Sequence, residues 1–258
     1  MAKPEHRMKS PIELSDRLSA RTRPEGWPLM YQSWGNLLFM HWRISVEELR
    51  PHIPEPLEID TFDGSAWVAI TPLTLWNVRP IFVPPVPFIS EFRELNVRTY
   101  VYYEDVPGVW LFSLDANSWL AVTGARLLYL LPYYNAEMEL TRSVATTDFR
   151  SERLDENGGN FGARWTITNE SPATSEPGSL EFFLTERYCL YTASESDVYR
   201  CRIHHQPWQL SAASLESYET DIFAANGLPT PSGSPLLHAA DPVDVEVWGL
   251  EKLTKVTQ

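Results

Sequence analysis

The segment Glu94–Tyr103 reads ELNVRTYVYY, and its alternation of polar and apolar residues predicts a β-strand. Successive side chains of a strand point to opposite faces, so Glu94, Asn96 and Arg98 share one face and the intervening apolar residues share the other. Such a polar face borders either bulk solvent or a polar cavity. In a cavity, the guanidinium of Arg98 can bind a carboxylate and Glu94 can act as an acid or a base.

Further strands are predicted on both sides of this segment. The capping-box pattern Ser45-Val-Glu-Glu48 opens a short helix, Ser118–Leu131 suits a buried helix ended by Pro132, and a small helical stretch is expected near Ser214–Ala224. The expected turns are Asp63-Gly64 and Pro107-Gly108. The expected strands are Asn36–Arg43, Leu57–Asp60, Ala66–Leu75, Val109–Leu114, Ala136–Ala145, Phe161–Thr168, Leu180–Thr192, Val198–His204 and Val243–Leu250.

The composition favours a single β-dominated domain with a few helices, an α+β fold. Of 258 residues, 43% are hydrophobic and 12% aromatic, and 21 are proline, which is typical of strands and turns in a folded core. Residues 1–33 are expected to form an irregular lead-in and residues 34–258 one domain, because we find no internal repeat and no long linker. The proline-rich segment 79–92 is expected to be a stiff loop that walls or caps a cavity.

The net charge of −13 disfavours nucleic acid and anionic membranes as partners, because both require a basic face. The first residues lack the apolar segment of a secretory signal. No stretch approaches the roughly 18–20 apolar residues that span a bilayer. These features predict a soluble, cytoplasmic protein.

Lysine is confined to the two ends of the chain, at Lys3, Lys9, Lys252 and Lys255. Schiff-base enzymes require a desolvated amine, and pyridoxal-phosphate enzymes and Walker-type phosphate loops each require a lysine. The sequence therefore excludes these chemistries unless an end of the chain folds into the site. Arginine-rich codon usage is an alternative cause of the lysine count and leaves this exclusion unchanged.

Two cysteines and several histidines complete the inventory of reactive side chains. Cys189 and Cys201 lie in two β-rich segments and are expected to be buried thiols, with a disulfide as the alternative. The neighbours His204 and His205 point to opposite faces of a strand and are poorly placed to share one metal ion. No nucleophile elbow and no dinucleotide-binding glycine motif is present, so neither a metal nor a cofactor is expected.

The first predicted strand adds two candidates for ligand binding. His41 and Arg43 share one face of it and Trp42 lies on the other. A packed or surface histidine is the alternative for His41.

Several motifs resemble a known family. Ile53–Asp60 (IPEPLEID), after a strand and a capped helix, resembles the early part of acetoacetate decarboxylase. Six further motifs, spread over about residues 36–248, resemble a large bacterial family catalogued as domain of unknown function 2071 and grouped with the decarboxylase fold. They are FDGSAWV, ELNVRTYV, VWLFSLDA, ARLLYLLPYY, LTERYCLY and HHQPW.

The resemblance implies a cone-like, partly closed antiparallel β-sheet with short helices and a central cavity. The decarboxylases carry a Pro-Lys-Lys motif whose lysine forms the Schiff base, and the matching place here reads Pro132-Tyr133-Tyr134. One decarboxylase carboxylate matches Glu94. The second falls among Trp67–Ala69 and is missing, and the first-strand arginine also lacks a match.

The leading hypothesis is a cavity that binds a small anionic or carbonyl compound. Asn96, Arg98, His41 and Arg43 are its candidate ligand-binding residues, and Glu94, Tyr133 and Tyr134 are its candidate catalytic residues for isomerisation, dehydration or non-covalent decarboxylation. One alternative is a non-catalytic ligand sensor or interaction module, with a homo-oligomer as its assembly. A minor alternative is metal-dependent hydrolysis through His204, His205 or His238.

Overall fold

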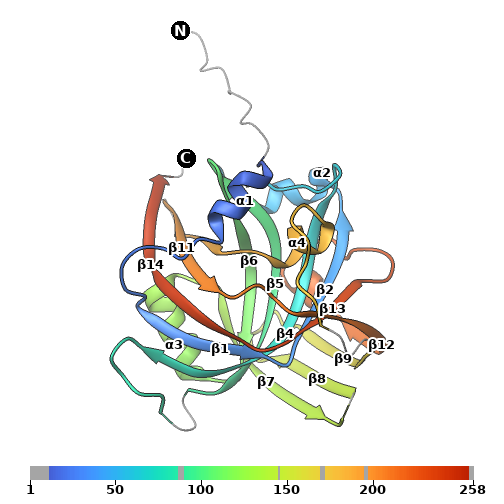
Figure 1. The fold of residues 1–258 in the computed structure, drawn as a ribbon. Coiled ribbons are helices and arrows are strands. Elements are labelled where there is room, and N and C mark those ends of the chain that lie inside the picture. The colour runs from blue at the N-terminus through green and yellow to red at the C-terminus, as the bar shows by residue number, and fades with distance from the viewer. Residues whose placement is uncertain (1–11, 87–89, 145, 169–171, 195–196, 256–258) are drawn as a thin grey trace.

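The protein is described by a computed structural model of residues 12–86, 90–144, 146–168, 172–194 and 197–255. Within these ranges, fourteen strands form one continuous sheet, accompanied by a few short helices (Figure 1). The β-dominated α+β fold expected from the sequence is therefore confirmed. Lys3 and Lys9, and part of the proline-rich loop, lie outside the described residues.

The elements follow one another along the chain with short connections. The strands are β1 (Met30–Gly35), β2 (Leu37–Ile44), β3 (Glu58–Ile59), β4 (Ala66–Pro80), β5 (Phe92–Tyr103), β6 (Val106–Ala116), β7 (Tyr133–Arg142), β8 (Thr146–Arg153), β9 (Asn160–Ile167), β10 (Cys189–Ala193), β11 (Asp197–His205), β12 (Leu210–Thr220), β13 (Leu236–Ala240) and β14 (Val243–Lys255). The helices are α1 (Leu14–Ala20), α2 (Val46–Leu49), the 3-10 turn η1 (Arg50–His52), α3 (Trp119–Tyr129), α4 (Leu180–Thr185) and α5 (Ile222–Ala225).

The sheet closes on itself twice. Strands β1, β14, β11, β10, β6, β5 and β4 pair in that order, and the β4–β1 pairing completes what we call the cavity ring. Strands β6, β7, β8, β9, β12, β13, β2, β4 and β5 complete a second circuit, which we call the packed ring. Nearly all pairings are antiparallel, and β6 makes short parallel pairings with β7 and β10. The two rings share β4, β5 and β6 as a common wall.

The alternation of β5 separates two hydrophobic cores across this wall. Leu95, Val97 and Val101 belong to the core of the packed ring, together with side chains of β2, β7, β8 and β9. Phe92 and Tyr100 belong to the core of the cavity ring. Each face of the wall is thus buried, as expected for a sheet covered on both sides.

Helices lie at opposite ends of the cavity ring. In Figure 1, α1 and α4 lie at the upper end and α3 lies toward the lower left. At the α1–α4 end the Tyr100 hydroxyl donates to the Leu184 carbonyl at 2.8 Å, and the Arg17 guanidinium lies 4.9 Å from the Phe183 ring centre. At the other end only Val122 and Tyr129 of α3 are buried. The end under α1 and α4 is therefore the more tightly closed one.

Local signals in the sequence are confirmed where a cap or a turn determines the backbone. Ser45 caps α2 by accepting from the Glu48 amide, and the reciprocal bond of the capping box is also present. Ser118 caps α3, and the helix ends at Leu130 in the left-handed conformation, two residues before Pro132. The turn at Asp63-Gly64 is also present.

The turn expected at Pro107-Gly108 was wrong. Both residues lie inside β6, and the β5–β6 turn is at Glu104-Asp105, where Glu104 has a φ of 53°. Gly108 serves a close approach instead, because a Cβ there would lie 2.6 Å from the Cys189 carbonyl oxygen of β10.

Two other segments change type. Leu180–Thr192 was expected to be one strand, but Ser179 caps α4 by accepting from the Phe182 amide, and only Cys189–Ala193 is strand. A small helical stretch was expected near Ser214–Ala224; the short helix α5 begins only at Ile222, because β12 pairs with β9 through Thr220.

Some elements of the structure were not expected from the sequence. Residues 1–33, expected as irregular, contain α1 and the start of β1. Strand β8 was not expected, although its burial alternates strictly from Thr146 to Arg153. Among the described residues, no helix is both long and apolar enough to cross a membrane.

Gly124→Ala is expected to stabilise the fold by about 0.5–1 kcal/mol, because alanine favours the helix interior. The added Cβ would meet nothing within 4 Å in the middle of α3. The measurement is the free energy of unfolding in urea. Gly64→Ala is the control: its Cβ also meets nothing, but its φ of +74° disfavours alanine and predicts lower stability. A loss of stability in Gly124→Ala would contradict the expectation.

Candidate functional site

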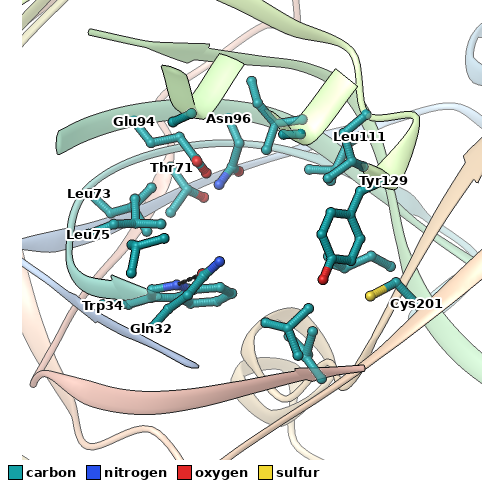
Figure 2. Close-up of a pocket in the computed structure, with 18 of the residues that line it drawn as sticks. Gln32, Trp34, Thr71, Leu73, Leu75, Glu94, Asn96, Leu111, Tyr129 and Cys201 are labelled. Carbon is teal, nitrogen blue, oxygen red and sulfur yellow. Dashed lines mark hydrogen bonds between the residues drawn. The ribbon is translucent and has the colours of Figure 1, made fainter. Parts of the chain in front are cut away.

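A cavity of about 290 Å³ lies inside the cavity ring and reaches α3 (Figure 2). Its walls come from β1, β4, β5, β6, β11 and β14, with α3 at one end. The β5 residues Glu94, Asn96 and Arg98 all line it. Of the two settings open for this polar face, solvent or cavity, the structure therefore has the cavity.

Glu94 and Tyr133 form the closest polar contact in the cavity wall. The Tyr133 hydroxyl donates to Glu94 Oε2 at 2.5 Å, and both side chains are buried. Burial raises the pKa of Glu94 to about 7, although hydrogen bonds from Tyr133 and Asn96 lower it in part. Burial and the neighbouring Glu94 carboxyl raise the pKa of Tyr133 well above its usual value. Glu94 can thus exchange a proton near neutral pH while Tyr133 stays protonated.

The chain brings these two residues together through the parallel pairing of β6 with β7. Leu114 of β6 pairs with both Asn96 and Tyr133, which places the first residue of β7 beside the polar face of β5. The end of α3 holds this junction, because Arg126 Nε donates to the Tyr133 carbonyl oxygen at 2.7 Å.

Asn96 and Thr71 add polar atoms that are free to bind a ligand or water. They face each other across the β4–β5 pairing. Asn96 Oδ1 and Thr71 Oγ1 are buried and have no hydrogen-bond partner among the described residues. Buried polar atoms without partners are uncommon, so these two mark a place where a bound molecule would be stabilised.

Arg98 is the cation of the cavity that lacks a counter-ion. Its guanidinium lies 5.0 Å from the Phe39 ring centre, and its buried Nε and Nη2 have no hydrogen-bond partner. In the described part of the chain no carboxylate forms an ion pair with it. In Arg153 the two corresponding atoms, Nε and Nη2, donate to the buried Asp115 carboxylate at 3.0 and 2.8 Å. Arg98 therefore retains the capacity to bind an anion.

A second arginine of the cavity, Arg187, is paired with a carboxylate that it shares with Arg17. Arg187 Nη1 and Arg17 Nη1 each donate to Asp60 Oδ2 at 2.7 Å. Burial alone would raise the pKa of Asp60, but the guanidinium groups of Arg187 and Arg17 hold it below its ordinary value. Arg187 is thus held by the protein through Nη1 and Nε, while its buried Nη2 has no hydrogen-bond partner among the described residues.

His205 and Trp208 line the cavity near Arg98 and were not among the expected cavity residues. The His205 ring lies 4.6 Å from the ring of Tyr188 and 4.9 Å from that of Trp208, and its Nδ1 lies 2.7 Å from the Gln206 carbonyl oxygen. Burial lowers the pKa of His205 to about 4, so the ring is neutral at pH 7. The HHQPW motif was their signal in the sequence, but alternation alone could not say which histidine points inward.

Three expected site residues lie outside the cavity lining. Tyr134 follows Tyr133 on the strand and points to the other face, where the Arg153 guanidinium lies 4.1 Å from its ring centre. Arg43 is exposed, 5.0 Å from the Trp67 ring centre. His41 is buried behind the lining and stacks on Phe39 at 5.8 Å. The alternation that separates His204 from His205 also separates the two tyrosines.

Neither lysine nor a metal-ligand cluster occurs in the described part of the cavity wall. Lys252 lies in β14 and donates to Asp197 at 2.7 Å on β11, and it is not a lining residue. Across the described ranges, no group of three or more His, Cys, Asp or Glu side chains is arranged to hold a metal ion. His204 instead faces Glu246, with Nδ1 3.8 Å from its carboxylate.

The two cysteines are free and buried, as expected. Cys201 pairs with Leu190, and Cys189 pairs with the next residue, Arg202, so the two thiols point to opposite faces. Cys201 lines the cavity beside Tyr129, on the wall across from Glu94 and Asn96 (Figure 2). A disulfide between them is therefore ruled out by the register.

Comparison with known proteins places the fold among relatives. Residues 31–244 match the model of the family DUF2071, described as an uncharacterised conserved protein. The uncharacterised protein YqjF of Bacillus subtilis (strain 168) is 41% identical over 229 residues, which are 89% of this chain and 94% of that protein.

Two solved structures share the fold at low identity. The enduracididine biosynthesis enzyme MppR, complexed with pyruvate, has a TM-score of 0.62 at 13% identity and covers 92% of this chain and 93% of its own. An acetoacetate decarboxylase has a TM-score of 0.58 at 14% identity and covers 100% of both chains. At these identities the similarity establishes the fold alone, and it confirms the expected acetoacetate-decarboxylase-like architecture.

Tyr133→Phe is expected to raise the pKa of Glu94 above about 7, because the hydroxyl stabilises the charged carboxylate. The measurement is a pH titration of the glutamate carboxyl by infrared or carbon-13 NMR spectroscopy. Tyr129→Phe, a lining tyrosine without a bond to Glu94, is the matched control and should leave the titration unchanged. An unchanged titration in Tyr133→Phe would refute the assignment.

Glu94→Gln is expected to gain stability relative to the wild type as the pH rises. A carboxyl whose pKa is about 7 when folded and about 4.5 when unfolded stabilises the fold below pH 4.5, and this contribution is lost by pH 7. The difference in unfolding free energy should therefore grow by about 3 kcal/mol between pH 4.5 and 8. Urea denaturation at both pH values measures it, with exposed Glu139→Gln as the control for net charge.

Proposed function

The chain belongs to the DUF2071 family of uncharacterised conserved proteins, and we propose that it binds a small anionic or carbonyl compound in the cavity and acts on it without a Schiff base. The observation that carries this proposal is the pairing of Glu94 with Tyr133 on the same wall as the uncompensated Arg98. The wall thus combines a group that transfers protons near neutral pH with a cation that lacks a counter-ion.

The described lining of the cavity contains no lysine, which directs the chemistry toward proton transfer. A Schiff base requires an amine at the reacting carbon, and Tyr133 occupies the position where the resembling decarboxylases have lysine. Tyrosine cannot form an imine, but its hydroxyl can donate a hydrogen bond. The proposal therefore assigns general acid-base work to Glu94 and hydrogen bonding to Tyr133 and Asn96.

A balanced step follows for a carbonyl compound with an acidic α-hydrogen. The Glu94 carboxylate removes that proton and becomes neutral, and the electron pair moves onto the carbonyl oxygen as an enolate. The amide of Asn96 or the hydroxyl of Tyr133 stabilises this oxygen. The proton then returns to the same or another carbon, which gives exchange or isomerisation, or a β-substituent departs, which gives elimination.

The choice of test compounds rests on the anion that Arg98 would bind and on a fold relative. MppR, which shares the fold, is complexed with pyruvate, a 2-oxo acid. A 2-oxo acid carries both a carboxylate for Arg98 and an acidic α-hydrogen for Glu94. This class is therefore the first to examine, followed by aldehydes and aromatic acids.

One observation favours the non-catalytic alternative, a ligand sensor or an interaction module that forms a homo-oligomer. Helix α3 exposes Trp119 and Leu127, at 68% and 75% of their surface, next to the cavity. Exposed apolar side chains in a cluster are typical of an interaction surface. In that case ligand binding would persist without turnover.

Binding is tested by calorimetry with 2-oxo acids, aldehydes and aromatic acids. Arg98→Gln should weaken binding of the preferred acid by about 10- to 100-fold, which is the contribution of a charged hydrogen bond. Arg43→Gln removes an arginine outside the cavity lining and should bind like the wild type. If no compound binds the wild type more tightly than Arg98→Gln, the proposal fails.

Catalysis is tested by exchange of the α-hydrogen for deuterium in D₂O, followed by NMR. Glu94→Gln should slow this exchange by about 10²- to 10⁴-fold, as expected for loss of a general base. Binding with no exchange in the wild type would support the non-catalytic alternative.

A further inference from the structure

We infer that the ligand is a monocarboxylic acid with a bulky apolar body, of the size of a branched alkyl or phenylalkyl group, whose carboxylate lies at Arg98 and whose body points toward α3. This inference rests on the proposed function and specifies its substrate class. It predicts that short oxo acids and dicarboxylic acids are not the preferred ligands.

The walls beside and across from the polar face are apolar. Leu73 and Leu75 of β4 lie next to Glu94 and Phe92 of β5, and Ile203 of β11 and Val247 of β14 also line the cavity (Figure 2 labels Leu73 and Leu75). A short acid at Arg98 would leave these walls in contact with water. An apolar body would cover them, and each buried methylene would strengthen binding by about fourfold.

The polar lining groups of β1 and β11 are already paired within the protein. Gln32 Oε1 accepts from Trp34 Nε1 at 2.7 Å, and Gln32 Nε2 lies 3.0 Å from the sulfur of Met30 (Figure 2). On the facing wall, Cys201 Sγ lies 3.2 Å from the Trp248 carbonyl oxygen. These groups present little unpaired polarity to a ligand, so this part of the cavity favours an apolar body.

The size of the cavity sets the size of the body. Its volume is about 290 Å³, and an apolar cavity of about 150 Å³ holds one benzene molecule. The space is therefore about twice that of a benzene ring. A ring with a short side chain, or a branched chain of similar volume, fills it together with the carboxylate.

The charges in the cavity argue for one carboxylate rather than two. The two lining arginines lie at one place, since Arg98 and Arg187 are 6.0 and 4.8 Å from the ring centre of Tyr100, and Arg187 shares the Asp60 carboxylate with Arg17. His205 is buried and held among Tyr188, Trp208 and the Gln206 carbonyl, and so it adds no positive charge at pH 7. A second carboxylate on the ligand would lie in an apolar wall without a counter-ion, which is costly.

The direction of the ligand follows from which end of the cavity is open. Near Arg98 the lining residues Phe39 and Trp208 are almost fully buried. At the α3 end the lining residues Leu120 and Leu128 are 41% and 68% exposed. Arg98 and Phe92 are six residues apart on β5, which corresponds to about 20 Å of strand. The acid therefore lies inward and the body extends outward past Glu94.

The test is calorimetry of the full-length protein with a series of 2-oxo acids. The series comprises pyruvate, 4-methyl-2-oxopentanoate, 2-oxooctanoate and phenylpyruvate, with 2-oxoglutarate as the dicarboxylic control. We expect 2-oxooctanoate and phenylpyruvate to bind at least 100-fold more tightly than pyruvate, and 2-oxoglutarate to bind no more tightly than pyruvate. Equal affinities along the series, or tightest binding of 2-oxoglutarate, overturn the inference.

Variants of α3 test where the body lies. Ala125 lines the cavity, so Ala125→Phe should abolish the tighter binding of the long acids relative to pyruvate and leave the affinity for pyruvate unchanged. Leu127→Phe places the same aromatic side chain on the exposed side of α3 and should behave like the wild type. Ala121→Leu, one turn earlier in the lining, repeats the test if Ala125→Phe does not fold. Unchanged affinity for the long acids in a folded lining variant also overturns the inference.

The outcomes distinguish this inference from the proposed function. If acids bind in an Arg98-dependent manner but without regard to their length, the inference fails and the proposed function stands. If no acid or carbonyl compound binds the wild type, both fail.

Discussion

The two faces of β5 impose the constraint on which the rest of the molecule depends. This strand lies in the wall shared by the two rings, so both of its faces are enclosed by protein. Leu95 and Val97 fill the packed ring with apolar volume, and Glu94, Asn96 and Arg98 face the cavity ring. A ring with such a polar wall cannot be filled by apolar side chains without leaving charges unsatisfied, and it stays hollow. The packed ring is filled by apolar side chains, and the cavity ring encloses the cavity.

The acids near this wall differ in how many cations they meet, and their pKa values follow. Asp60 binds two arginines, and its pKa is lowered despite burial. Burial raises the pKa of Asp115 to about 6, with Arg153 alone opposing it. Glu94 has no cation, and burial raises its pKa to about 7. The acid left without a cation is the one that faces the cavity, and the arginine left without a carboxylate, Arg98, lies four residues away on the same face. Perturbed acids of this kind are typical of functional sites.

The architecture is shared with acetoacetate-decarboxylase-like proteins at 14% identity or less, so the side chains in the cavity are this chain's own. The junction of α3 and β7 presents Tyr133 to the cavity, and the described cavity wall contains no lysine. A buried phenol beside a buried carboxyl keeps its proton, so this position donates a hydrogen bond instead of attacking a carbonyl. The same scaffold thus accommodates different reactive groups, as expected when function resides in side chains placed on a common fold.

The sequence alone determined what depends on neighbours along the chain. Alternation identified the polar face of β5, a capping box located α2, Pro132 marked the end of α3, and Asp63-Gly64 located a turn. Position 133 is tyrosine, a side chain that cannot form a Schiff base, and the motifs indicated the family. Local signals failed where a distant strand made the choice: β9 keeps Ser214–Thr220 extended, and β10 requires glycine at Gly108 inside β6.

Only the tertiary structure decided which side of each strand faces the cavity. Periodicity states that two neighbours point apart, but not which of them points inward, because that depends on how the sheet closes. The closure of the cavity ring through the β1–β4 pairing placed Tyr133 and His205 inward and Tyr134 outward. It also left Arg98 without a counter-ion, since Asp60 is bound to Arg17 and Arg187, which lie far from it in the sequence. The closure of the sheet and the ion pairs depend on residues that are far apart in the sequence, so no local sequence pattern predicts them.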